Sequence, residues 1–129
     1  MTSIDAVAAA ALVAAAVSEA HSRAVSISVA VVDDAGSLVA FHRMSPAPRF
    51  SADFAIAKAR TSAAFSVPTS SLEELYKERP AFANFPAGIL IQGGLPLMHK
   101  GECVGAIGVS GVQSHEDEQV AQAGVNALG

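Results

Sequence analysis

Two cations occupy positions from which they could move a proton or hold an anion. Lys58 shares helical spacing with Phe54 and Phe65, and a lysine among apolar neighbours can have a lowered pKa and act as a base. The alternative is a side chain whose stem covers apolar surface while its charge stays in water. Arg43 ends an expected strand, where its fork could hold a ligand carboxylate or pair with Asp53. Both cations are therefore candidate catalytic residues.

The acidic run Glu116–Glu118 offers matching carboxylates. It falls in the first turn of an expected helix, where the helix dipole favours negative charge. Ser114 and Asp117 fit a capping box, which gives Asp117 a structural role. Glu116 has no such role and is the candidate acid or base. With the two cations it would form a cofactor-free set for proton transfer on a carboxylated or oxygenated metabolite, as in an isomerase or lyase.

Two glycine-containing segments could leave bare backbone at one edge of a sheet. Gly93 and Gly94 lie between apolar segments, where they permit positive φ and the close approach of a ligand to their amides. A bulge or tight turn without a ligand explains them equally well. Ser110 and Gly111 end another expected strand and could converge on the same edge. The sequence therefore predicts a recess for a small molecule here, flanked by the two cations.

Four histidines are candidate donors to a metal or to a haem iron: His21, His42, His99 and His115. None pairs with another at zinc-binding spacing, so no dedicated metal site is expected. A haem needs only one axial donor, and His21, near the end of the first expected helix, could supply it. A histidine at a helix C-terminus is also favourable without any ligand. His42 and His99 are the alternatives.

Hydrophobic periodicity predicts the elements that must position these residues. Expected helices span Ser3–Ser22, Ser51–Phe65, Ser70–Glu78 and Ser114–Leu128; expected strands span Val25–Asp33, Leu38–Arg43, Gly88–Gln92, Leu95–His99 and Glu102–Val109; Ala81–Gly88 is an expected loop. The order is α-β-β-α-α-β-β-β-α. Hairpin links between the strands predict one α+β domain over residues 1–129, with a five-stranded antiparallel sheet flanked by helices.

Composition excludes several classes of function. The 129 residues carry a net charge of -4, and their eight scattered Lys and Arg residues form no basic surface for nucleic acid. The single cysteine, Cys103, cannot form an internal disulfide, which fits a reducing compartment. The apolar run Ala6–Val17 is too short to span a bilayer, and no basic residue precedes it. We therefore expect a cytoplasmic protein that binds neither nucleic acid nor membranes. Its many small residues favour close contacts in a homo-oligomer.

Five blocks, in this order, resemble one known family. They are VAVVD at 29–33 with Gly36, FHRM at 41–44, AKARTSAAF at 57–65, QGGLPL at 92–97, and GAIGVSG at 105–111 followed by EDE at 116–118. Together they cover nearly the whole chain, which resembles the GlcG/HbpS haem-binding-like family. That family also includes the C-terminal domain of PduO-type proteins.

The resemblance implies a five-stranded antiparallel sheet with helices, assembled into homo-oligomers, and haem binding for some members. For this chain it implies a small-molecule ligand, with haem as the candidate cofactor. Together with the glycine-lined sheet edge, it predicts a binding site at that edge near a subunit interface. It also strengthens the functional interpretation of Lys58. One departure is Val112, because many members have Ser-Gly-Gly where this chain has Ser110, Gly111 and Val112. The proton-transfer enzyme remains the alternative function.

Overall fold

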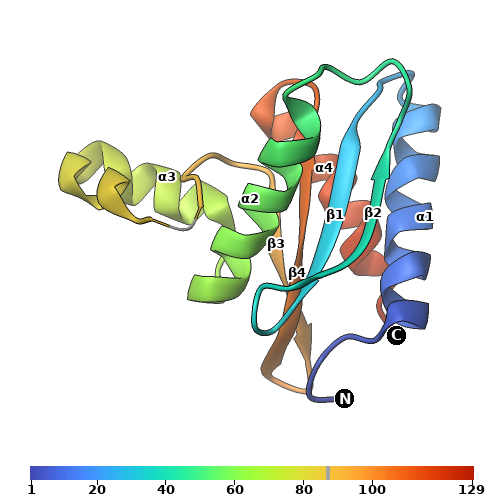
Figure 1. Cartoon of the computed structure of the whole chain (residues 1–129), viewed down its shortest axis with the longest axis horizontal. Helices are drawn as coiled ribbons and strands as arrows, with labels where there is room; N and C mark the ends of the chain where they lie inside the picture. The colour runs from blue at the N-terminus through green and yellow to red at the C-terminus, as the bar shows by residue number, and fades with distance from the viewer. Residues whose placement is uncertain (87) are drawn as a thin grey trace.

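A four-stranded antiparallel sheet lies at the centre of the computed structural model, which describes residues 1–86 and 88–129 (Figure 1). Its strands are β1 (Ser28–Asp33), β2 (Leu38–Arg43), β3 (Gly94–His99) and β4 (Glu102–Ser110), in the spatial order β2-β1-β4-β3. The β1–β2 and β3–β4 pairs are hairpins, and β1 joins them by pairing with β4. Arg43, Ser28 and Ser110 therefore form one row across one end of the sheet.

Helices cover both faces of this sheet. α1 (Ala6–Ser22) and α4 (Ser114–Asn126) lie on one face and α2 (Ser51–Phe65) on the other. α3 (Thr69–Glu78) and the short 3-10 helix η1 (Pro80–Asn84) project away from the body (Figure 1). Because side chains alternate along a strand, Val29 and Val31 of β1 pack in the core under α1 and α4, whereas Ala30 and Val32 pack under α2. The predicted single α+β domain is confirmed.

Small residues let α2 lie close to the sheet. Gly108 on β4 has no room for a side chain, because a Cβ there would collide with backbone atoms of Ala55 and Ala59. A Cβ on Gly94 would collide with the carbonyl of Lys58. This close approach brings Lys58 directly over the end of β4.

The predicted strand Gly88–Gln92 is wrong, so the sheet of the described residues has four strands instead of five. Its apolar residues favour a strand, but two of its amides donate to side chains instead of to a neighbouring strand. The Ile89 N–H donates to Thr61 Oγ1 at 2.9 Å, and the Gln92 N–H donates to Glu73 Oε1 at 3.1 Å. The segment therefore enters β3 as irregular chain.

Other element boundaries differ from the predictions by a few residues. α1 begins at Ala6 instead of Ser3, because the Asp5 carboxylate caps it by accepting from the Ala8 N–H at 2.8 Å. The expected loop Ala81–Gly88 contains most of η1, and Ala87 within it lies outside the described residues. No helix in the described ranges is long and apolar enough to cross a membrane.

Candidate functional site

Lys58 lies inside the protein, where its side chain is 2% exposed. Its ammonium donates to the Val109 carbonyl at 2.9 Å and to Asp117 Oδ2 at 3.1 Å. Asp117, in the first turn of α4, is equally buried and also accepts from the Val112 N–H at 3.1 Å. The interpretation of Lys58 as a side chain whose charge stays in water is therefore wrong. Lys58 instead joins α2, β4 and α4 through a buried ion pair.

Burial and attraction act in opposite directions on this pair. Burial lowers the pKa of Lys58, and the charge and hydrogen bond of Asp117 oppose that shift. Burial raises the pKa of Asp117, and Lys58 and the Val112 N–H oppose that shift. Each charge is thus stabilised mainly by its partner, as expected where water is excluded.

Glycine is required at position 93 because the Lys58 ammonium occupies the space of a side chain. A Cβ on Gly93 would lie 2.7 Å from Lys58 Nζ and 2.8 Å from the Val109 carbonyl oxygen, and the backbone has φ +133°. The neighbouring Gly94 N–H donates to Thr69 Oγ1 at 2.9 Å. Both glycines are buried, so in this conformation the predicted recess is filled by the protein's own groups.

The remaining residues of the predicted site lie around this buried pair or at a distance from it. Ser110 is 2% exposed, and Gly111 follows it with φ +151°, where a Cβ would collide with the Ser26 carbonyl. Arg43 is exposed, two strands from Ser110 in the same row, and donates through Nη2 to the Ala47 carbonyl at 3.1 Å. It forms no ion pair with Asp53 among the described residues.

Glu116 does have a capping role, which corrects the sequence interpretation. The N-cap of α4 is Gln113, and the capping box joins Gln113 with Glu116 rather than Ser114 with Asp117. The Gln113 N–H donates to Glu116 Oε1 at 3.4 Å. The sequence interpretation put the N-cap at Ser114, one residue too late, and so gave the capping role to Asp117 instead of Glu116. Asp117, which the sequence interpretation set aside, is the acid that contacts Lys58.

Two histidines line a separate, open groove beside α1 and the edge strand β2. His21 comes from the last turn of α1, and His42 comes from β2, the edge strand beside it. Both side chains are exposed, and both line two adjoining hollows of about 480 Å³ and 420 Å³. We call these hollows the histidine groove; their other lining residues are Ala10, Val13, Ala14, Val17, Ser18, Ala24, Val25, Ser26, Met44, Ser45 and Pro46.

The positions of the candidate histidines relative to the strands could partly be predicted from the sequence. Strand alternation puts His42 and Arg43 on opposite faces of β2, so His42 shares the face of α1, whereas Arg43 does not. His99 ends β3 next to the β3–β4 turn, at the other end of that strand from Gly94. What the sequence could not supply was the packing of α1 beside β2, which brings His21 to His42.

Comparison with known proteins agrees with a haem-linked family. The family model described as "Haem degrading protein HbpS-like" matches residues 4–126. The chain belongs to the HbpS-like family. Protein GlcG of Escherichia coli is 38% identical over 103 residues, which cover 79% of this chain and 77% of that protein. The resemblance inferred from the sequence blocks is therefore confirmed.

Solved structures of similar proteins share the whole fold. A double mutant of HbpS from Streptomyces reticuli is 35% identical with a TM-score of 0.96, covering 100% of this chain and 89% of that chain. A PduOC–haem complex is 26% identical with a TM-score of 0.87, covering 98% of this chain and 95% of that chain. The second of these relatives is a complex with haem.

Proposed function

We propose that this protein binds haem, or a similarly flat and partly apolar molecule, in the histidine groove. The observation that carries the proposal is the convergence of two exposed imidazoles, His21 and His42, on one open groove. An imidazole nitrogen is a common axial donor to haem iron. Haem is also the ligand of the PduOC relative, and the matching family model describes a haem-degrading protein.

The wall of the groove suits a flat apolar ring. α1 turns Leu12 and several alanines into the core, and turns Ala10, Val13, Ala14 and Val17 toward the groove. Small side chains form a shallow, even surface, so a ring could lie along the helix with its metal within reach of an imidazole. Binding sites for such cofactors are mostly apolar, with a few polar groups that fix orientation.

The glycine-lined sheet edge is less well suited to a ligand than the histidine groove. The amide of Gly94 and the space beside Gly93 are used by Thr69 and Lys58. Binding at Gly93, Gly94, Ser110 and Gly111 would need α2 or the segment before β3 to move. A role for these four residues in ligand binding stays a prediction from the sequence.

The alternative proton-transfer enzyme also stays a prediction. Lys58, Arg43 and Glu116 each make their hydrogen bonds with other groups, and among the described residues no two of the three share a hydrogen bond or an ion pair. Catalysis by all three would need a rearrangement that brings Arg43 across two strands.

A homo-oligomer is part of the proposal, because the histidine groove is open on one side. α1 exposes an alanine- and valine-rich surface next to the edge strand β2. A second copy covering this surface would enclose a bound ring and exclude water from the iron. Native mass spectrometry of the purified protein tests this point, since it reports the number of chains and any retained ligand together.

Haemin titration tests the proposed ligand. We expect the wild-type protein to give a shifted Soret band that saturates, and His21→Ala, His42→Ala or their combination to weaken it. His115→Ala is the matched control, because His115 is exposed on α4, outside the groove. A spectrum that is unchanged in the combined variant would overturn the histidine groove as the site. No Soret shift with the wild-type protein would overturn haem binding itself.

A further inference from the structure

The segment from Ile89 to Gln92, which we call the strap, lies between the projecting α3–η1 part of the chain and β3 (Figure 1). It forms no backbone–backbone hydrogen bond among the described residues. Its three apolar side chains, those of Ile89, Leu90 and Ile91, are only half-buried, and none belongs to a core cluster. Segments with few buried apolar contacts and few backbone hydrogen bonds open locally at a low cost in free energy.

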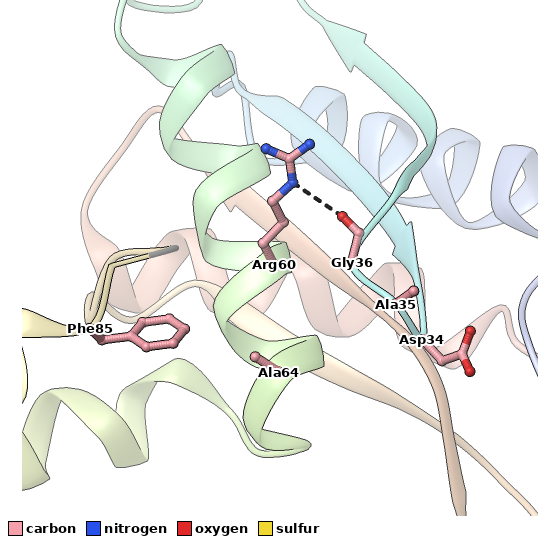
Figure 2. Close-up of a pocket in the computed structure, with 6 residues that line it drawn as sticks. All are labelled: Asp34, Ala35, Gly36, Arg60, Ala64 and Phe85. Carbon is pink, nitrogen blue, oxygen red and sulfur yellow. Dashed lines mark hydrogen bonds between the residues drawn. The ribbon is translucent and has the colours of Figure 1, made fainter.

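The chain is anchored on both sides of the strap. Before it, the Phe85 ring packs against Phe65 of α2 with ring centroids 5.0 Å apart, and Figure 2 shows the ring directed toward Ala64 on the same helix. After it, the Gly93 carbonyl accepts from the Val109 N–H at 3.0 Å. These contacts leave the strap itself as the part that can move without displacing α2 or β3.

Hydrogen bonds to side chains hold the strap in place. The Ile89 N–H donates to Thr61 Oγ1 at 2.9 Å, and the Gln92 N–H donates to Glu73 Oε1 at 3.1 Å. The Gln92 side chain donates through Nε2 to Glu118 Oε2 at 3.2 Å. Gln92 therefore connects α3, which carries Glu73, with α4, which carries Glu118. We call these two contacts of Gln92 the latch.

The latch lies beside the buried pair of Lys58 and Asp117. Glu118 directly follows Asp117 on α4. Burial lowers the pKa of Lys58, and Glu73 is, with Asp117, one of the two acids whose charge opposes that shift. Gly93, the residue after the strap, is so close to the ammonium that a Cβ there would lie 2.7 Å from Nζ. Because the latch and Gly93 adjoin this group, release of the strap removes protein that separates the ammonium from water.

We propose that the strap opens locally, by release of the Gln92 latch, and gives small molecules in solution access to the Lys58 amine. Opening requires no unfolding of the sheet or of α2, since the strap belongs to neither. A lysine amine that is buried in the closed state and exposed in the open state is a nucleophile whose reactivity the strap controls. The recess that the sequence predicts at Gly93 and Gly94 would then form only when the strap is open.

Reductive methylation with formaldehyde and cyanoborohydride, read by mass spectrometry of peptides, tests the strap. The other lysines, Lys77 and Lys100, are exposed and serve as internal standards for the reagent. We expect Lys58 of the native protein to be labelled more slowly than either, at a rate that low urea concentrations hardly change, because local opening exposes little surface. Labelling through global unfolding would instead rise steeply with urea.

Two substitutions of the latch residue should speed this labelling. Gln92→Ala removes the bond to Glu118 and should raise the rate at Lys58 about tenfold, because a hydrogen bond to a charged group is lost. Gln92→Glu should raise it at least as much, since its carboxylate repels that of Glu118. Gln122→Ala is the matched control, because the Gln122 amide donates to Asn126 on the same helix and takes no part in the latch.

Two results would overturn the proposal. One is a labelling rate of Lys58 that is the same in the wild type and in both Gln92 variants. The other is a wild-type rate that rises with urea as steeply as global unfolding does, which would mean that only the unfolded chain exposes the amine. Should Gln92→Ala lower the global stability, the urea dependence of its labelling still separates the two routes. Haemin titration of the same variants should be unchanged, because no strap residue lines the histidine groove.

Discussion

The buried pair of Lys58 and Asp117 replaces the hydration of each charge with the other charge and with backbone groups. Such a pair adds little net stability compared with apolar residues of the same size, but breaking it leaves an uncompensated buried charge. Its main consequence here is geometric, since it holds α4 and the end of β4 against α2.

Substitution of one partner should therefore be more harmful than substitution of both. We expect Lys58→Met to lower the free energy of unfolding by about 3–5 kcal/mol, because it strands the Asp117 carboxylate. In Lys58→Met combined with Asp117→Asn no buried charge remains, and the amide oxygen can still accept from the Val112 N–H. Urea denaturation should show the double variant to be more stable than Lys58→Met alone. Lys77→Met, which breaks an exposed pair, is the control and should not change the denaturation curve measurably. A double variant less stable than Lys58→Met would show that the pair does not act as a unit.

The pH dependence of Asp117→Asn follows from the lowered pKa of Lys58. Removal of the carboxylate removes the attraction that opposes burial, so the pKa of Lys58 falls further below its ordinary value of 10.5. Between this lowered pKa and 10.5 the unfolded chain binds more protons than the folded chain, so stability rises with pH. We expect the stability deficit of Asp117→Asn relative to wild type to shrink between pH 7 and pH 9.5 in urea denaturation. A deficit that is equal at both pH values would contradict a charged, stranded Lys58.

At the scale of elements, helix α2 depends on glycines of the sheet that lie beneath it. A Cβ on Gly108 would meet backbone atoms of Ala55 and Ala59, which cannot move aside as a flexible side chain can. We expect Gly108→Ala to lower the free energy of unfolding by about 1–3 kcal/mol or more through overpacking. Gly101→Ala is the comparison, because position 101 has φ +83° but open space around it, so it measures backbone strain alone. A Gly108→Ala variant as stable as the wild type in urea denaturation would contradict a close contact between α2 and β4 at this position.

Most elements could be predicted from the sequence because local patterns determine them. Period-two alternation located β1, and the turn residues after it located β2 as the returning strand of a hairpin. The prediction of a strand at Gly88–Gln92 was wrong because its apolar residues favour a strand, while the partners of its amides, Thr61 and Glu73, are distant in sequence. The predicted N-cap of α4 was one residue too late, because glutamine, found at position 113, is a less common N-cap residue than serine, found at position 114. The residue pattern within each segment could identify neither the irregular chain at Gly88–Gln92 nor the N-cap at Gln113.

At the scale of the whole molecule, the site was less predictable than the fold. Lys58 and Gly93 were singled out by type and spacing, and the structure does bring them together, but as packing partners. The partner of Lys58, Asp117, is 59 residues away from it in the sequence, and the burial of Asp117 depends on how α4 packs. His21 and His42 were both candidate donors, yet only the packing of α1 beside β2 brings them to one groove.

The histidine groove exists only when α1 and β2 are packed together, so a ligand that occupies it must bind the folded state. Such a ligand raises the free energy of unfolding by about 2.7 kcal/mol at a free concentration 100 times its Kd. We expect haemin to raise the melting temperature of the wild type and of His115→Ala, with the increase growing as the logarithm of haemin concentration. The combined His21→Ala and His42→Ala variant should lose most of this increase, because the axial donors are gone while the apolar wall remains. Thermal denaturation at several haemin concentrations measures it. An equal increase in the combined variant would mean that haemin binds elsewhere, and a decrease in the wild type would mean that haemin prefers the unfolded chain.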